Sequence, residues 1–162
     1  MDQSTTHLEL ALQAAMKRCM DDIVRQANAD AALLEGAGMD KNQIRNVLNV
    51  AEESRSLAVV TNFIRYQLGR SQTRDAWQHK QQGKCFGLQV IQQIEASDGI
   101  VAKQTQAALE RAQERVEDIP EEAIDELRYD LMRYYLGYLN RAFIYGKETR
   151  KWGDLRPAGK GE

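Results

Sequence analysis

The chain has 162 residues, of which 43% are hydrophobic and 28% are charged, and its formal net charge at pH 7 is −2. This length supports one domain with a single sizeable core, and the composition lies in the range of ordinary globular proteins. No apolar run approaches the roughly 18 residues that a membrane helix requires, and the opening "MDQSTTHLEL" lacks the basic residues of a secretory signal. We therefore expect a cytoplasmic protein that has no membrane partner.

The first predicted element is a long helix. Thr6 and Glu9 have the spacing of a capping box, and the apolar residues after them recur with a helical period as far as Leu34. The sequence "EGAGMD" then ends this helix. The only two prolines are Pro120 and Pro157, and no segment alternates apolar and polar residues for long enough to predict a strand.

The next helix begins near Asp40, and a change of its apolar side predicts where it ends. On a helix, the apolar residues up to Ala51 lie on one side, and the apolar residues that begin at Leu57 lie on another. The two sides are about 190° apart around the helix axis. One straight helix would bury two opposite sides, so we predict a break at residues 53–56 and a separate helix that ends at Gly69. The alternative is a central helix that is buried on both sides.

The least regular stretch is residues 71–87, where two glycines interrupt any helix. We expect a loop or two partial turns there. Helical periodicity returns from Phe86 to the sequence "SDG", and again from Val101 to Ile119.

The last predicted helix begins after Pro120 and ends at Gly146, which has the place of a glycine that terminates a helix. The sequence beyond it contains further glycines, a proline and few apolar residues, so we expect a flexible basic C-terminal tail over residues 151–162. The prediction is thus an all-α protein, a single-domain helical bundle of about five to six helices over residues 1–150.

Side chains that carry enzyme or metal chemistry are sparse. His7 and His79 are the only histidines, and no H-E-x-x-H or E-x-x-H spacing places two metal ligands on one side of a helix. Cys19 and Cys85 show neither a C-x-x-C spacing nor a disulfide pattern. The acids at residues 121–126 are typical of a helix start, where they compensate the helix dipole. We predict that the protein is not an enzyme and has no metal site and no cofactor.

Charge is distributed in blocks along the chain. Residues 1–40 and 97–130 have an excess of acids, whereas residues 41–96 and 131–162 have an excess of bases. A protein with this pattern can present one basic face while the rest of its surface stays acidic, although the same blocks also fit ordinary solvated helix faces.

Several cations of the basic blocks lie near predicted helix ends and in loops, and two arginines lie eight residues apart on the last helix. Such side chains can contact phosphates along a nucleic-acid backbone. These candidates are Lys41, Arg45, Arg65, Arg70, Arg74, Lys80, Lys84, Arg133 and Arg141.

The sequence "YYLGYLNRAFIYG" holds five of the eleven aromatic residues of the chain. On a helix, Tyr134, Tyr138 and Tyr145 form a stripe, and the apolar part covers more than half of the circumference. Such a helix is central in a bundle or lies at a subunit interface. We interpret the stripe as a protein interface, because base-stacking aromatics more typically lie on a sheet.

Three segments in order, "NQIRNVLNVAEE", "NFIRYQLGR" and "LMRYYLGYLNRAFIYGKE", resemble the small all-helical subunit of type III CRISPR effector complexes. The resemblance covers about residues 40–150. It implies a non-catalytic subunit of an RNA-guided antiviral defence complex, which stacks in several copies and contacts the backbones of the guide RNA and the target RNA. Its other partners would be further subunits of that complex. The motifs carry over Lys41, Arg45, Arg65, Arg70 and Arg141 as contact residues.

A second hypothesis comes from a different class of protein. The chain can instead be a helical adaptor that binds a partner protein through its aromatic stripe, without binding nucleic acid.

Overall fold

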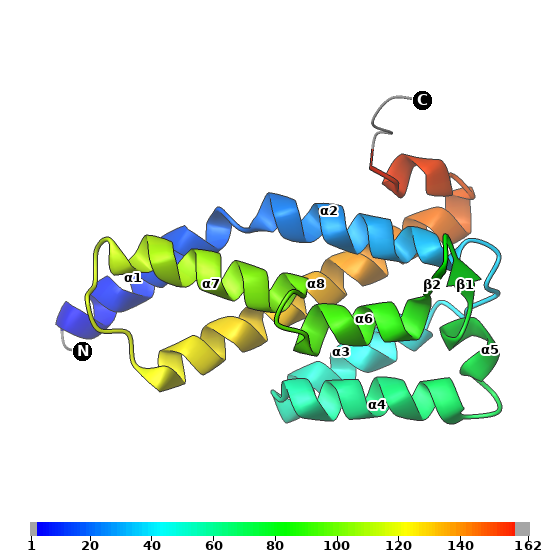
Figure 1. Ribbon diagram of the computed structural model, residues 1–162, viewed down its shortest axis with the longest axis horizontal. Coiled ribbons are helices and arrows are strands. Elements are labelled where there is room, and N and C mark those ends of the chain that lie inside the picture. The colour runs from blue at the N-terminus through cyan, green and yellow to red at the C-terminus, as the bar shows by residue number, and fades with distance from the viewer. Residues whose placement is uncertain (1–2, 158–162) are drawn as a thin grey trace.

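The computed structural model describes residues 3–157, which form a helical bundle with one small hairpin (Figure 1). The longer helices of this part of the chain are α1 (Gln3–Lys17), α2 (Met20–Ala31), α3 (Gln43–Ser54), α4 (Leu57–Gly69), α6 (Phe86–Glu95), α7 (Ile100–Gln113) and α8 (Glu121–Thr149). The short elements are the helix α5 (Arg74–Trp77), the strands β1 (Lys80–Gln81) and β2 (Lys84–Cys85), and the 3₁₀ turns η1 (Ala32–Leu34) and η2 (Trp152–Leu155). The predicted all-α fold is confirmed.

Helix α8 is the central element. It has 29 residues, and its fully buried side chains include Leu131, Met132, Tyr135 and Leu136. Helices α2, α7 and α3 pack against it, while α1 packs on α7 and α4 packs on both α3 and α6. In Figure 1, α6 and α7 cross the front of the molecule and α8 passes behind them.

The predicted first helix is in fact two helices, which is why the structure has one long helix more than we expected. Helix α1 already includes Gln3, before the predicted start at Thr6. The backbone N–H groups of Arg18 and Cys19 donate to the carbonyls three residues earlier, so the chain tightens into a turn there. Because of this turn, α1 packs along α7 whereas α2 packs along α8. The apolar period continues across the turn, so the sequence did not reveal it.

The predicted break between α3 and α4 is confirmed. Arg55 adopts a left-handed conformation with φ of 49°, and the Ser56 hydroxyl accepts a hydrogen bond from the Val59 N–H at 3.2 Å. Two antiparallel helices result, each with its own buried side.

The stretch that we expected to be a loop contains a short helix and a β-hairpin. Lys80 pairs with Cys85 and Gln81 pairs with Lys84, and the two residues between the strands both have positive φ. This is the conformation that a two-residue hairpin turn requires. Two-residue strands are too short to produce a visible alternation of apolar and polar residues.

The C-terminal region also differs from our prediction. Helix α8 continues past Gly146 to Thr149, and the segment Trp152–Leu155 packs back onto α8, with both terminal side chains of that segment buried. Arg150 rather than Gly146 takes the left-handed position at the helix end. The predicted tail therefore does not begin at residue 151, and its residues 158–162 lie outside the described part of the chain.

None of the helices within residues 3–157 combines the length and the apolar character needed to cross a bilayer.

One carboxylate is buried in the bundle. Asp30 on α2 is 2% exposed and accepts hydrogen bonds from the Tyr135 hydroxyl at 2.6 Å, from Gln26 Nε2 at 3.0 Å and from Gln89 Nε2 at 3.1 Å. These bonds join α2, α6 and α8. Burial is the largest influence and raises the pKa of Asp30, although the three hydrogen bonds and the charge of Lys84 oppose the rise.

We predict that Gly146→Ala destabilises the protein by about 1–3 kcal/mol, because an added Cβ would lie 2.2 Å from a ring carbon of Trp152. Gly137→Ala on the same helix is the matched control. No heavy atom lies within 4 Å of a Cβ added there, so alanine should stabilise the helix by up to about 1 kcal/mol. Urea unfolding followed by tryptophan fluorescence measures both, and equal effects would contradict the packing of Trp152 on α8.

We also predict a pH-dependent difference in stability between the wild type and Asp30→Asn. The raised pKa means that the stabilising contribution of Asp30 is complete below the pKa of the unfolded chain and is lost as pH rises through the folded pKa. An asparagine keeps an acceptor for both glutamines and does not ionise. Its unfolding free energy should therefore increase relative to wild type between about pH 3 and pH 8.

Asp30→Leu is the control for the hydrogen bonds. Relative to Asp30→Asn, it removes the hydrogen-bonding partner of the buried Tyr135 hydroxyl and should cost about 1–3 kcal/mol at every pH, because neither variant ionises at position 30. A constant difference between the wild type and Asp30→Asn across this range would show that burial does not shift the titration of Asp30.

Candidate nucleic-acid interface

One end of the bundle gathers most of the predicted cations. The linker between η1 and α3, helix α5, the β1–β2 hairpin and η2 all lie at this end (Figure 1). Trp77 Nε1 on α5 donates to Gln43 Oε1 at 3.4 Å, and His79 Nε2 lies 2.8 Å from the Glu35 carbonyl oxygen. We call this the basic end. Its predicted cations are Lys41, Arg70, Arg74, Lys80 and Lys84.

Two further cations reach the basic end from α8 and were missing from our predicted contact residues. Lys147 Nζ donates to the Met39 carbonyl oxygen at 2.7 Å, and Arg150 lines a hollow of about 410 Å³ beside the same linker. The sequence indicated these two cations only through the excess of basic residues in 131–162. Only the path of α8 places these side chains beside residues far earlier in the chain.

Arg133 and Arg141 lie on α8, away from the basic end, and each contacts a tyrosine ring. The Arg133 guanidinium carbon is 5.2 Å from the centre of the Tyr134 ring, and that of Arg141 is 5.8 Å from the centre of the Tyr138 ring. The two rings stack with centres 6.2 Å apart. Two arginines and two rings therefore form one continuous row along α8.

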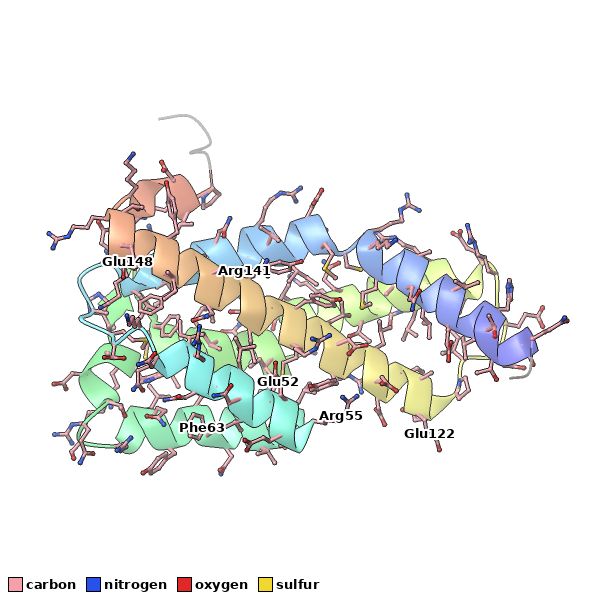
Figure 2. The ribbon with its side chains drawn as sticks, turned by 180° about the vertical axis from the view of Figure 1, so that it is seen from behind. Glu52, Arg55, Phe63, Glu122, Arg141 and Glu148 are labelled. Atoms are coloured by element: carbon pink, nitrogen blue, oxygen red, sulfur yellow. The ribbon has the colours of Figure 1, made fainter. Side chains whose placement is uncertain are left out.

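Arg141, at one end of this row, is on the face of the molecule that Figure 2 shows, where Glu52 is also visible. Arg45 is exposed and lies two helical turns before Glu52, on the same side of α3. We call this surface, formed by α3, α4 and α8, the α8 face. It holds Arg45, Arg133 and Arg141.

Arg65 differs from the other predicted cations because a carboxylate engages it. Both of its terminal nitrogens donate to Glu95 on α6, and this hydrogen bonding lowers the pKa of Glu95. Within residues 3–157, no carboxylate oxygen lies within 4.0 Å of the charged nitrogens of the other eight predicted cations. Those eight charges remain available to a ligand, whereas that of Arg65 is already balanced.

The predicted aromatic stripe has partners inside the chain. Tyr134 and Tyr138 are half-buried, and the Tyr138 hydroxyl contacts Met20 Sδ at 3.6 Å. Tyr145 is more exposed, but its hydroxyl donates to Asp154 of the C-terminal segment, and this bond raises the pKa of Tyr145. The rings thus mainly hold α8 to its neighbours.

A second aromatic stripe, which our sequence analysis missed, runs along the outer side of α4. Its members are Val59, Phe63, Tyr66 and Arg70, at intervals of four, three and four residues. Tyr66 is 56% exposed and Val59 is 44% exposed. From the sequence we predicted only the buried side of α4, although Phe63 and Tyr66 lie off the period of that side.

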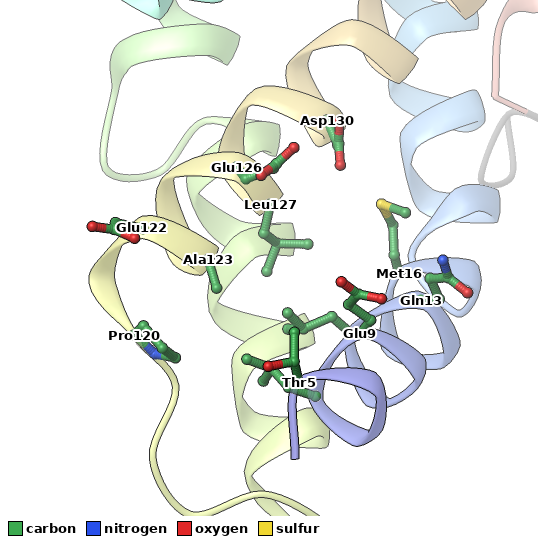
Figure 3. Close-up of a pocket in the computed structure, with 12 residues that line it drawn as sticks. Thr5, Glu9, Gln13, Met16, Pro120, Glu122, Ala123, Glu126, Leu127 and Asp130 are labelled. Carbon is green, nitrogen blue, oxygen red and sulfur yellow. The ribbon is translucent and has the colours of Figure 1, made fainter. Parts of the chain in front are cut away.

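The opposite end of the bundle is acidic. Residues 110–126 contain eight acids and two bases, and they form the end of α7, the start of α8 and the loop between them. Between α1 and the first half of α8 lies a groove of about 450 Å³, which Figure 3 shows. Its apolar lining is Leu8, Leu12, Met16, Ala123 and Leu127. Its acidic residues are Glu9, Glu122, Glu126 and Asp130. We call it the acidic groove.

The groups best suited to catalysis occupy structural positions. No three His, Cys, Asp or Glu side chains gather as a metal site among the described residues. Burial raises the pKa of the Cys19 thiol, which disfavours the reactive thiolate. Asp30 lines none of the four hollows described for residues 3–157.

No protein-family model, no curated protein and no solved structure matches this chain.

Proposed function

We propose that this protein is a non-catalytic small subunit of a type III CRISPR RNA-guided complex, which contacts the backbones of guide and target RNA through its cations. The observation that carries the proposal is the separation of charge in the fold. Cations without an intramolecular carboxylate partner occupy the basic end and the α8 face, while the acids of residues 110–126 occupy the other end.

Unpaired surface cations support phosphate binding on energetic grounds. Each phosphate that a lysine or arginine neutralises releases condensed counterions, and this release drives sequence-independent binding. A cation already paired with a carboxylate must first break that pair, as Arg65 would with Glu95. The net charge of −2 does not oppose the proposal, because residues 110–126 at the far end contain eight acids and only two bases.

The acidic groove supports the second part of the proposal, which is that copies of the chain stack head to tail. The groove lies opposite the basic end along the bundle (Figures 1 and 3). An acidic surface of one copy and a basic surface of the next attract each other, and such a contact repeats without closing. Contacts between ends leave the α8 face, with Arg45 and Arg141, open to nucleic acid along the stack.

We predict that Arg45→Glu combined with Arg141→Glu weakens binding of an unstructured uridine-rich RNA by roughly tenfold or more at about 0.1 M salt. Fluorescence anisotropy over a salt series measures the affinity. The plot of log affinity against log salt should have a negative slope, and its magnitude should fall by roughly 0.7 for each phosphate contact that is lost.

Lys103→Glu combined with Arg115→Glu provides the matched control. It changes the net charge equally, but Lys103 is on α7 and Arg115 is at the acidic end. This pair should leave RNA affinity within about twofold, since the described contacts place neither residue on the proposed track. A salt-independent affinity, or equal losses in both pairs, would count against the proposed function.

For stacking, we predict that the purified protein self-associates at about 50 mM salt and dissociates at about 500 mM, because the salt screens contacts between charged ends. Glu9→Lys combined with Glu122→Lys, at the acidic groove, should abolish the association. Glu52→Lys combined with Glu53→Lys on α3 is the control for net charge. Sedimentation velocity measures all three proteins, and a wild type that stays monomeric at low salt would contradict head-to-tail stacking.

The alternative, an adaptor that binds a partner protein through Tyr134, Tyr138 and Tyr145, has less support. Two of these rings are half-buried in the protein, and the third donates to Asp154. An adaptor also gives no role to the unpaired cations of the basic end.

A further inference from the structure

Tyr66 on the outer stripe of α4 is the most exposed aromatic side chain among the described residues, whereas Phe63 beside it is half-buried against the core. Tyr66 is 56% exposed, and no hydrogen bond from its hydroxyl is present within residues 3–157. Its ring centre lies 6.3 Å from that of Phe63, and the guanidinium carbon of Arg70 lies 5.8 Å from the Tyr66 ring centre. Figure 2 shows Phe63 on the same face as Arg141.

Helix α4 itself carries only positive charge, although Asp75 follows Arg74 on α5 and Glu95 pairs with Arg65. Helix α4 contains no aspartate or glutamate. Arg70 ends the stripe, and Arg74 follows on α5 one turn into the basic end. Arg65, the one arginine of α4 with a carboxylate partner, bonds to Glu95 on α6. An apolar, aromatic surface that leads directly into unpaired cations complements a ligand with flat rings and a negative backbone.

We propose that the α4 stripe is a base-stacking surface for single-stranded nucleic acid, with Tyr66 and Phe63 in contact with bases and Arg70 in contact with the adjoining phosphates. This inference rests on the proposed function and adds the contacts that the bases make. Every base has a flat π-face, so stacking on tyrosine tolerates any sequence, as a subunit that does not read sequence requires.

The dimensions of the stripe fit a short run of nucleotides. The twelve residues from Val59 to Arg70 are joined by eleven steps that rise about 16 Å along the helix, which is room for two or three unstacked bases. The side chain of Arg70 is flexible, so its guanidinium can turn from the Tyr66 ring to a phosphate while a base stacks on that ring. A second copy presents no acids on its own α4, so two such stripes do not complement each other. The acidic groove of a second copy is the competing occupant for Arg70 and Arg74, and the sedimentation of Tyr66→Ala separates the two.

The test compares RNA with an abasic phosphodiester chain of the same length. Wild-type protein should bind the RNA more tightly than the abasic chain. Tyr66→Ala should weaken RNA binding by roughly 5- to 100-fold and leave binding of the abasic chain unchanged, because only the base contact is lost. Tyr66→Phe, which keeps the ring, should stay within about twofold of the wild type. Fluorescence of 2-aminopurine in the RNA should change on binding to the wild type and not to Tyr66→Ala.

The outcomes separate this inference from the proposed function. If RNA and the abasic chain bind equally and Tyr66→Ala has no effect, while Arg45→Glu with Arg141→Glu still weakens binding, the stacking surface is wrong and phosphate binding stands. If neither chain binds, the proposed function itself fails. If Tyr66→Ala instead abolishes self-association in sedimentation, the stripe is a protein interface and the inference is overturned. Because Tyr66 is mostly exposed, thermal unfolding should be little changed.

Discussion

Burial of one broad side of α8 is the constraint on which the rest of the structure depends. A helix of 29 residues is about 44 Å long, and apolar side chains that cover more than half of its circumference cannot all face one neighbour. Helices α2, α3 and α7 therefore surround it, and the remaining helices pack on that layer. Even the C-terminal segment folds back, because Trp152 fits over Gly146 where no side chain stands in its way.

The distribution of charge follows from this arrangement. Because α8 spans the bundle, its first turn and its last turn lie at opposite ends. Its first turn is acidic, which suits the positive end of the helix dipole, whereas Lys147 lies in its last turn and suits the negative end. The loops that meet Lys147 add Lys41 and the cations of the hairpin. The preference of helix ends for particular charges therefore contributes to the separation of acidic and basic residues between the two ends of the molecule.

Arginines and aromatic rings adjoin each other twice on the surface, along α8 and along α4. The two cases differ in burial. On α8 the rings of Tyr134 and Tyr138 mainly secure the packing against α1 and α2, so Arg133 and Arg141 are the parts open to a ligand. On α4 the Tyr66 ring itself is open. Phosphate contact is therefore the natural role of the α8 row, and contact with flat rings is the natural role of the α4 stripe.

The sequence by itself determined the helical class and the break at residues 53–56, because a local period or cap indicates each of them. For the last helix it left two places open, the centre of the bundle and a subunit interface. It also identified most of the unpaired cations, since their types and positions at helix ends are local properties. It did not reveal the turn at Cys19, the packing of a side chain against Gly146, the partner of Arg65 or the exposure of Tyr66. The first three depend on residues outside the local sequence pattern: Gln104 lies beside the Cys19 thiol, Trp152 lies over Gly146, and Glu95 lies beside Arg65. The exposure of Tyr66 depends on packing as well, because no described helix covers the outer side of α4. Only the packed structure decides such distances, because the hydrophobic burial that sets them acts between segments that no sequence period relates.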